Sequence, residues 1–240
     1  MESIRLNKYL AQSGICSRRE ADRLIEQGRV QVNGSVAVMG QTVTEQDEIV
    51  CNRKLVQGRK KIVVLAYNKP VGVTCSEKDK HAEKLITDMI DYPIRVTYAG
   101  RLDKDSEGLI LLTNNGDLIQ RMMRGTNRHE KEYVVKVDKE ITPDFLEKMA
   151  AGVYLKELDV TTRACDITQI GKYTFRIILT QGLNRQIRRM CQACGCQVKH
   201  LKRIRVLNIE LADLKTGAFR ELEHAELEEL YRIVGLGALQ

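Results

Sequence analysis

The sequence lacks long apolar runs, a secretory leader and the glycine-rich loops that hold nucleotides. No segment approaches the roughly 18 apolar residues that cross a bilayer, so no transmembrane helix and no membrane partner are expected. Residues 1–7 are polar and mixed, which argues against a signal peptide. No Gly-Lys-Ser/Thr follows a predicted strand, and residues 100–108 hold too few glycines for a dinucleotide loop. We therefore expect no nucleotide cofactor.

The cysteines lack the paired spacing of a disulfide framework, because their number is odd and several stand alone. The isolated cysteines are Cys16, Cys51, Cys75 and Cys165. This usage predicts a reduced, cytoplasmic protein.

A cluster of three cysteines and a histidine has to be weighed as a zinc site, since zinc needs four well-placed ligands. The cluster comprises Cys191, Cys194, Cys196 and His200. The first two fall one turn apart in a predicted helix, and the histidine falls in the next strand, so nothing fixes all four on one point. We expect free thiols and no metal. The other histidines stand alone and are expected at the surface: His81, His129 and His224.

The length and the net charge of the chain limit the number of domains and the class of binding partner. The chain has 240 residues, enough for a small module plus a domain of ordinary size. Its 43% hydrophobic and 30% charged residues are normal for a folded protein. A net charge of +7 and a pI near 9.0 indicate a polyanionic partner, with nucleic acid as the leading candidate.

The first 51 residues read as a small module of two helices and a hairpin. Leu6, Tyr9 and Leu10 recur at helical spacing. Ser17 stands three residues before Glu20, as in a capping box, and predicts a second helix. Asn33-Gly34 between valines predicts a hairpin turn, and residues 48–50 a last strand. We place the module at 1–51 and a polar, basic linker at 52–60.

The two predicted helices present five cations: Arg5, Lys8, Arg18, Arg19 and Arg23. Charge spacing alone fits two solvated helix faces as well as a docking surface. The wording RLNKYLAQSGICSRREADRLIEQGRVQVNG, however, resembles the αL RNA-binding motif. That resemblance implies a surface for RNA phosphates on the second helix and the following loop.

Residues 61–240 mix strands and short helices without strict alternation, which favours an α+β fold with a largely antiparallel sheet. Residues 62–67 predict a buried strand that stops before Pro70. Further strands are expected at 132–138 and across 159–180. Short helices are expected at 83–90, at 117–124, and from Thr142-Pro143 to Gly152.

An acidic loop precedes a buried strand at residues 109–112, and catalytic groups are commonly held at such places. The loop contains Asp103 and Asp105. The residues alone do not distinguish these two acids, and a solvated loop without chemistry explains them equally well.

A basic block follows at residues 185–205, with seven lysines and arginines and no acid. Apolar residues interleave with the charges, so we expect a folded segment with a helix that Asn184 caps and Gly195 ends. Alternation of Arg203 and Arg205 with apolar neighbours then predicts a strand with one basic face. Such a face suits a phosphate-lined groove, to which Arg185 and Arg189 would also contribute.

Together these stretches resemble one family. GRLDKDSEGLILLTNNGDL, HEKEYVVKVDKEIT and LTQGLNRQIRRMC, after the N-terminal module, look like the bacterial ribosomal RNA pseudouridine synthases of the RsuA/RluF group. Most of that group has threonine where this chain has Ser106, and serine is typical of the RluF type. The resemblance implies a pseudouridine synthase domain at 61–240, a mixed and largely antiparallel sheet flanked by short helices, and no cofactor. The implied substrate is ribosomal RNA, most simply 23S, and the protein is expected to be a monomer.

The resemblance also assigns roles. It implies that Asp103 is the catalytic aspartate, that Arg188 pairs with it, and that Tyr133 stacks on the target base and takes its proton. Arg101 would fill the space left when the base flips out. A carboxylate can attack the ring or the anomeric carbon, or take a ribose proton, and these routes stay open.

Two other functions have to be weighed. A non-catalytic RNA-binding assembly factor explains the basic surfaces but gives the acidic loop no role. A glycosidase-like hydrolase is disfavoured, because two acids two residues apart on one loop do not define a separated acid and base.

Overall fold

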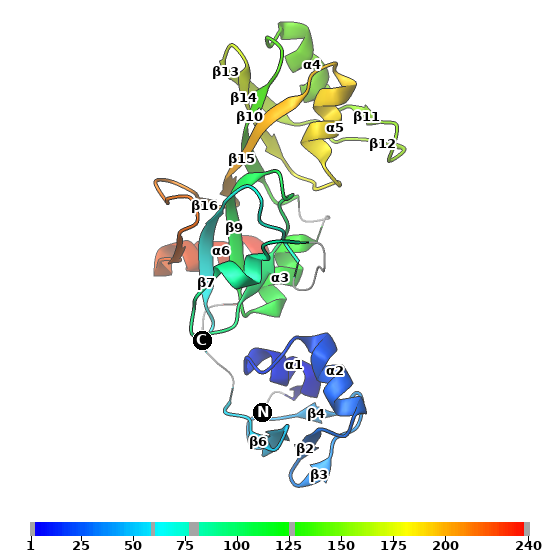
Figure 1. Cartoon of the computed structure of the whole chain (residues 1–240), viewed down its shortest axis with the longest axis vertical. Coiled ribbons are helices and arrows are strands. Elements are labelled where there is room, and N and C mark those ends of the chain that lie inside the picture. Colours follow the sequence, from blue (N-terminus) through cyan, green and yellow to red (C-terminus); the bar gives the residue numbers. More distant parts are fainter. Residues whose placement is uncertain (1–2, 59–60, 77–81, 125–127, 238–240) are drawn as a thin grey trace. The chain divides into compact units, whose positions relative to one another are not determined.

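The computed structural model describes most of the chain, namely residues 3–58, 61–76, 82–124 and 128–237 (Figure 1). His81 and the last two residues of the expected linker lie outside these ranges. The chain divides into two compact units. The first holds Met1–Val63 with Tyr92–Val96 and Asn114–Gly116, and the second holds the rest. No helix in the described ranges is long and apolar enough to cross a membrane.

The first unit includes the residues predicted to form a small module. Its elements are β1 (Ile4–Arg5), α1 (Leu6–Gln12), α2 (Arg18–Glu26), β2 (Val30–Val32), β3 (Ser35–Val36), β4 (Thr42–Val43), β5 (Ile49–Cys51) and β6 (Lys54–Leu55). Four of the strands form a sheet in the order β3-β2-β5-β6. Leu6 and Leu10 from α1 and Ile25 from α2 are buried in the core of this unit. Each such side chain contributes about 1.5–3 kcal/mol on burial.

Local sequence signals decide where these elements begin and end. The Ser17 hydroxyl accepts a hydrogen bond from the Glu20 amide at 3.3 Å, which confirms the predicted helix start. Asn33 and Gly34 have φ of 51° and 78°, the left-handed geometry that the predicted hairpin turn requires. The predicted last strand is also present as β5.

The expected linker is partly structured. Lys54–Leu55 pair with β5, and Val56 is 7% exposed in the core of the first unit. The polar and basic composition of 52–60 does not predict this two-residue strand, because a short edge strand needs few apolar residues.

Most of the chain from residue 64 onward forms the second unit, which contains a long mixed sheet. Its elements are β7 (Val64–Lys69), the 3₁₀ helix η1 (Ile86–Met89), β8 (Thr97–Ala99), β9 (Glu107–Thr113), α3 (Gly116–Met123), β10 (Lys131–Val137), α4 (Pro143–Ala151), β11 (Tyr154–Leu155), β12 (Val160–Thr161), β13 (Asp166–Gly171), β14 (Thr174–Leu179), α5 (Gln186–Ala193), β15 (Val198–Val206), β16 (Ile209–Glu210), β17 (Phe219–Glu221) and α6 (His224–Val234).

The main sheet follows the order β13-β14-β10-β15-β9-β7-β17. Among the described strand pairs, only β9 with β15 is parallel, so the predicted mixed and largely antiparallel sheet is confirmed. One core packs α4 and α5 on the β10, β14 and β15 half of the sheet. Another packs α3 and α6 on the β7 and β9 half (Figure 1). The β9–β15 pair joins the two halves.

Gly108 makes this junction possible. Its φ is +105°, and a Cβ added there would lie 2.2 Å from the Arg203 carbonyl oxygen and 2.7 Å from the Arg203 amide nitrogen. A side chain would therefore push β15 away from β9. Only glycine allows this close approach of the two backbones.

The short helix predicted at 83–90 is present as the four-residue 3₁₀ helix η1. One predicted helix cap needs correction. The helix after Asn184 has Arg185 as its N-cap, with φ of 51° and no side-chain cap bond. Asn184 instead accepts hydrogen bonds from Arg189 through its carbonyl oxygen at 3.1 Å and through Oδ1 at 3.3 Å. The cap at Thr142 is confirmed, since its hydroxyl accepts from the Phe145 amide at 3.2 Å.

Replacing Gly108 by alanine tests the junction. Positive φ costs a non-glycine residue roughly 1–2 kcal/mol, and the collision with β15 adds about 1–3 kcal/mol. Gly72→Ala is the matched control, because Gly72 has φ of +92° and a methyl group added there would meet nothing within 4 Å. In urea unfolding, Gly108→Ala should lose clearly more free energy than Gly72→Ala. Equal losses would contradict the close approach.

Candidate active site

The second unit contains a cavity of about 440 Å³ where the two halves of its sheet meet. Its walls come from the loop before β9, the end of α3, β10, the segment before α5, and β15. Residues that the sequence singled out contribute to it, namely Arg101, Asp103, Tyr133, Arg185, Arg188 and Arg203. Segments far apart in the chain therefore form one chamber.

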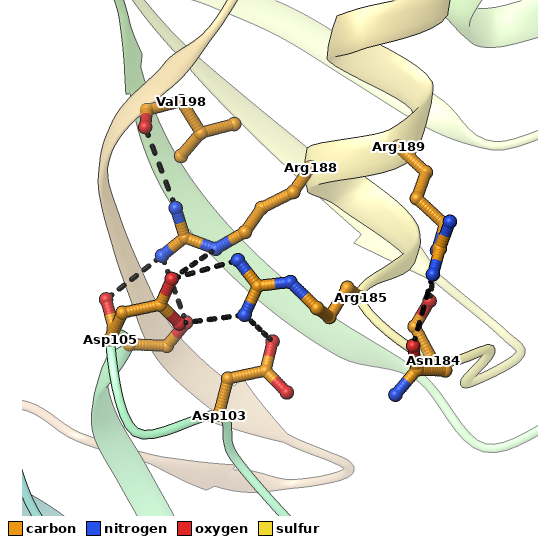
Figure 2. Close-up of polar contacts among 8 residues, drawn as sticks. Asp103, Asp105, Asn184, Arg185, Arg188, Arg189 and Val198 are labelled. Carbon is orange, nitrogen blue, oxygen red and sulfur yellow. Dashed lines mark hydrogen bonds and ion pairs between the residues drawn. The ribbon is translucent and has the colours of Figure 1, made fainter.

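Asp103 and Asp105, which the sequence alone could not distinguish, have different surroundings in the structure (Figure 2). Asp105 accepts two hydrogen bonds from Arg185, at 3.1 and 2.8 Å, and its Oδ2 lies 3.3 Å from Arg188 Nε. The Asp103 carboxylate makes one ion pair in the described structure, with its Oδ2 3.7 Å from Arg185 Nη1. Asp103 also lines the cavity. The carboxylate of Asp105 is thus held in ion pairs with two arginines, whereas the carboxylate of Asp103 is accessible to a ligand in the cavity.

The expected pairing of Arg188 with Asp103 is not formed. Arg188 donates through Nη2 to the Asp105 carbonyl at 2.8 Å and to the Ser106 hydroxyl at 3.3 Å. It also reaches the Val198 carbonyl at 3.4 Å. Its side chain, only 16% exposed, is held against the loop backbone, and the arginine beside Asp103 is Arg185. Arg185 is the N-cap of α5 and has a left-handed backbone conformation, with φ of 51°.

The charges around Asp105 alter its titration. Burial acts to raise the pKa of this carboxyl, but the hydrogen bond from Arg185 and the charges of both arginines outweigh burial. The pKa of Asp105 is therefore lower than usual. Asp105 fixes the two arginines over the acidic loop, and these arginines lie 80 and 83 residues further along the chain.

Tyr133 and Arg203 face each other across neighbouring strands. Tyr133 is half-buried on β10, and its register partner on β15 is Arg203. Arg203 is 2% exposed and donates from Nε to the Leu109 carbonyl at 2.6 Å and from Nη1 to the Arg101 carbonyl at 3.4 Å. The guanidinium thus ties β15 to β9 and to the acidic loop.

The predicted basic face on this strand is not formed. Arg203 points inward, and Arg205 is paired with Glu132 at 2.7 Å and with Glu130 at 2.9 Å. A register shift between Glu132 and Tyr133 interrupts the alternation that the sequence suggested. Arg189 is also engaged, with Glu157 and Asn184.

The basic residues of the first unit differ in their surroundings. Arg18 and Arg19 are exposed on α2. Arg23 is 3.3 Å from Glu20, and Arg5 donates to the Gly40 carbonyl at 3.1 Å. Lys8 is half-buried on α1.

Sequence reasoning missed two cavity residues, His129 and Lys131. His129 was expected at the surface but is 9% exposed, with Nε2 3.2 Å from the Arg121 carbonyl. Burial lowers its pKa, although that hydrogen bond opposes the change. Lys131 is half-buried and lies two positions before Tyr133, so strand alternation could have placed it on the same face. His224 is exposed as expected, with 78% of its side chain accessible.

The cysteines are free thiols. Within the described ranges, no three histidine, cysteine or acidic side chains are placed to share a metal ion. Burial raises the pKa of Cys191, and the neighbouring thiols Cys196 and Cys194 add to the shift. A thiol in such surroundings is a poor nucleophile.

Known proteins match both units. Residues 63–193 match the family described as RNA pseudouridylate synthase, and residues 4–49 match the S4 domain. The chain is 46% identical over 234 residues to the dual-specificity RNA pseudouridine synthase RluF of Escherichia coli K12, a match that covers 97% of this chain and 80% of that protein. It is 36% identical over 240 residues to ribosomal large subunit pseudouridine synthase B of Bacillus subtilis, covering 97% and 98%. A crystal structure described as pseudouridylate synthase matches with a TM-score of 0.69 at 28% identity, over 95% of this chain and 99% of that one.

The ion pairs of Asp105 predict a pH-dependent effect on stability. Its folded pKa is lower than the unfolded value near 3.9, so its contribution is present above about pH 4 and is lost as pH falls through the folded value. Because the side chain is 46% exposed, solvent limits the effect to about 0.2–1 kcal/mol. Asp105→Asn should lower the thermal unfolding midpoint at pH 7, and this difference from wild type should shrink as pH falls below about 4. Asp103→Asn is the control and should change the midpoint less; the opposite order would refute the distinction between the acids.

Proposed function

Because this chain belongs to the RNA pseudouridine synthases, we propose that it converts a uridine of ribosomal RNA, in the 23S RNA of the large subunit, into pseudouridine. The family match covers 63–193, and two relatives that span 97% of the chain carry this activity in their names. The observation that supports the proposal most directly is Asp103, a carboxylate on the wall of a cavity whose other charged groups are mainly cations.

The reaction breaks the bond between ribose and ring nitrogen and forms one between ribose and a ring carbon. No electrons are gained or lost overall, so the residues present can account for it without a redox cofactor. Asp103 acts as the reacting carboxylate, whether it attacks the ring or the anomeric carbon or takes a ribose proton. Its single long contact with Arg185, 3.7 Å, leaves its oxygens accessible while restricting their direction.

The target base has to leave its stack to enter the cavity. Flipping costs a few kcal/mol and is cheapest in a loop or bulge. Stacking on Tyr133 returns roughly 1–3 kcal/mol of that cost. The tyrosine oxygen then accepts the proton that the ring carbon loses as it releases its own to solvent, and the freed ring nitrogen takes up a proton. Arg101, exposed on the loop before β9, occupies the space that the base vacates.

The first unit holds the S4 domain and binds RNA. Arg18 and Arg19 on α2 supply phosphate contacts, with Arg5, Lys8 and Arg23 around them. We assign 1–51 to this module and 61–240 to the catalytic domain. Arg185 and Arg189 contribute to the RNA surface of the catalytic domain. The protein works in the cytoplasm as a monomer.

Release of tritium from uridine labelled at ring carbon five tests the reaction, because that hydrogen is lost when pseudouridine forms. Wild type should release label from 23S rRNA, and Asp103→Asn should be slower by about 10³-fold or more. Asp144→Asn, which removes an exposed acid on α4, should keep the wild-type rate.

No release by wild type, on naked rRNA and on ribosomal particles, would leave only the binding function. In that case the protein would be an RNA-binding assembly factor with salt-sensitive affinity.

A further inference from the structure

Two cations of the cavity wall have no carboxylate partner in the described structure. Arg203 Nη2 is buried and makes no hydrogen bond, and the other guanidinium nitrogens reach only backbone carbonyls. Lys131 Nζ has one long hydrogen bond, 3.4 Å to the His129 carbonyl. Both side chains line the same cavity. Their polar groups are thus desolvated without being neutralised.

The acids nearby are committed elsewhere. Glu132, adjacent to Lys131 on β10, points to the other side of the strand, where it contacts Arg205 at 2.7 Å and Arg176 at 3.6 Å. Asp105 is held by the two arginines at the start of α5, and Asp103 is directed toward Arg185.

The remaining charged neighbours of Lys131 are basic, and Tyr133 adds a phenol on the same face of β10. The basic neighbours come from β15, from the segment before β10, and from the end of α3, and are Arg203, His129 and Arg124. Buried like charges are costly unless an anion joins them. The site therefore lacks one negative group.

We propose that Lys131 and Arg203 form a subsite for one phosphodiester group of the RNA strand, next to the target nucleotide. The inference rests on the proposed function, since it takes the occupant of the cavity to be RNA. Lys131 and Tyr133 lie two residues apart on one strand and face the same side, about 6.6 Å apart along the strand. A base on Tyr133 would thus have its own or the adjoining phosphate beside the ammonium group. Arg203 would complete the contact through the free Nη2.

This placement of Lys131 predicts that the affinity for RNA depends on pH. Burial, with the charge of Arg203, lowers the pKa of Lys131 to about 8. A bound phosphate favours the charged ammonium and raises that pKa. The contribution of Lys131 to RNA affinity is therefore complete below pH 8 and is lost as pH rises through the higher pKa of the complex.

Three variants test the subsite by their affinity for a fluorescent 23S rRNA fragment, measured by anisotropy from pH 6.5 to 9.5, with tritium release followed in parallel. Lys131→Gln should bind roughly tenfold more weakly than wild type at pH 7. Wild type should lose affinity above pH 8, and Lys131→Gln should not change with pH in that range. Lys131→Arg stays charged, so it should bind well and also lose the pH dependence. Lys136→Gln removes an exposed lysine from the same strand and should behave like wild type.

Wild-type affinity in Lys131→Gln at pH 7 would overturn the subsite. So would a loss of affinity above pH 8 that persists in Lys131→Arg. If wild type binds RNA with the expected pH dependence but releases no tritium, the proposed reaction fails while the subsite stands. Circular dichroism of each variant shows whether a loss of affinity comes from unfolding. Arg203 is left unchanged because its hydrogen bonds hold β15 to β9, so replacing it would disturb the fold.

Discussion

The structure of the catalytic unit depends on one close contact, the parallel approach of β9 and β15 at Gly108 and Arg203. Each half of the sheet has its own core, and this contact joins them. The missing Cβ of Gly108 brings the backbones together, and the Arg203 guanidinium holds them by hydrogen bonds to the Leu109 and Arg101 carbonyls. The acidic loop leads into β9, and the basic helix α5 leads into β15. The contact between β9 and β15 therefore also brings the acidic loop next to the start of α5.

Some charged side chains in this region pair with one another and hold the structure together, and others are accessible to a ligand. Asp105 pairs with both Arg185 and Arg188 and fixes the loop to the helix, while the Asp103 carboxylate has one ion pair in the described structure, at 3.7 Å from Arg185. Among the described residues no acid pairs with Arg203 or Lys131, and the first unit presents Arg18 and Arg19 to solvent. A polyanion that carries a reactive base fits this distribution, because its phosphates meet the free cations while its base meets the free carboxylate. A protein that only bound RNA would have no use for the carboxylate of Asp103 on the cavity wall, which repels phosphate.

Local signals predicted much of the fold. Caps at Ser17 and Thr142 and the turn at Asn33-Gly34 depend on a few neighbouring residues, and each was predicted where the structure has it. The inward side chain of Arg203 depends on a partner strand nearly a hundred residues earlier, and the burial of His129 depends on α3; neither follows from periodicity. The difference between Asp103 and Asp105 likewise arises from contacts with the start of α5. Family resemblance chose Asp103, and the ion pairs of Asp105 give a physical reason for that choice.

The central claim is that these neighbouring acids have different tasks, with Asp103 reacting and Asp105 positioning the arginines. Single-turnover tritium release, with enzyme in excess over labelled 23S rRNA, tests this claim most directly because binding and product release no longer limit the rate. We expect Asp105→Asn to retain a rate within about tenfold of wild type, while Asp103→Asn should be slower by about 10³-fold or more. Equal loss in both variants, or a rapid Asp103→Asn enzyme, would contradict the claim.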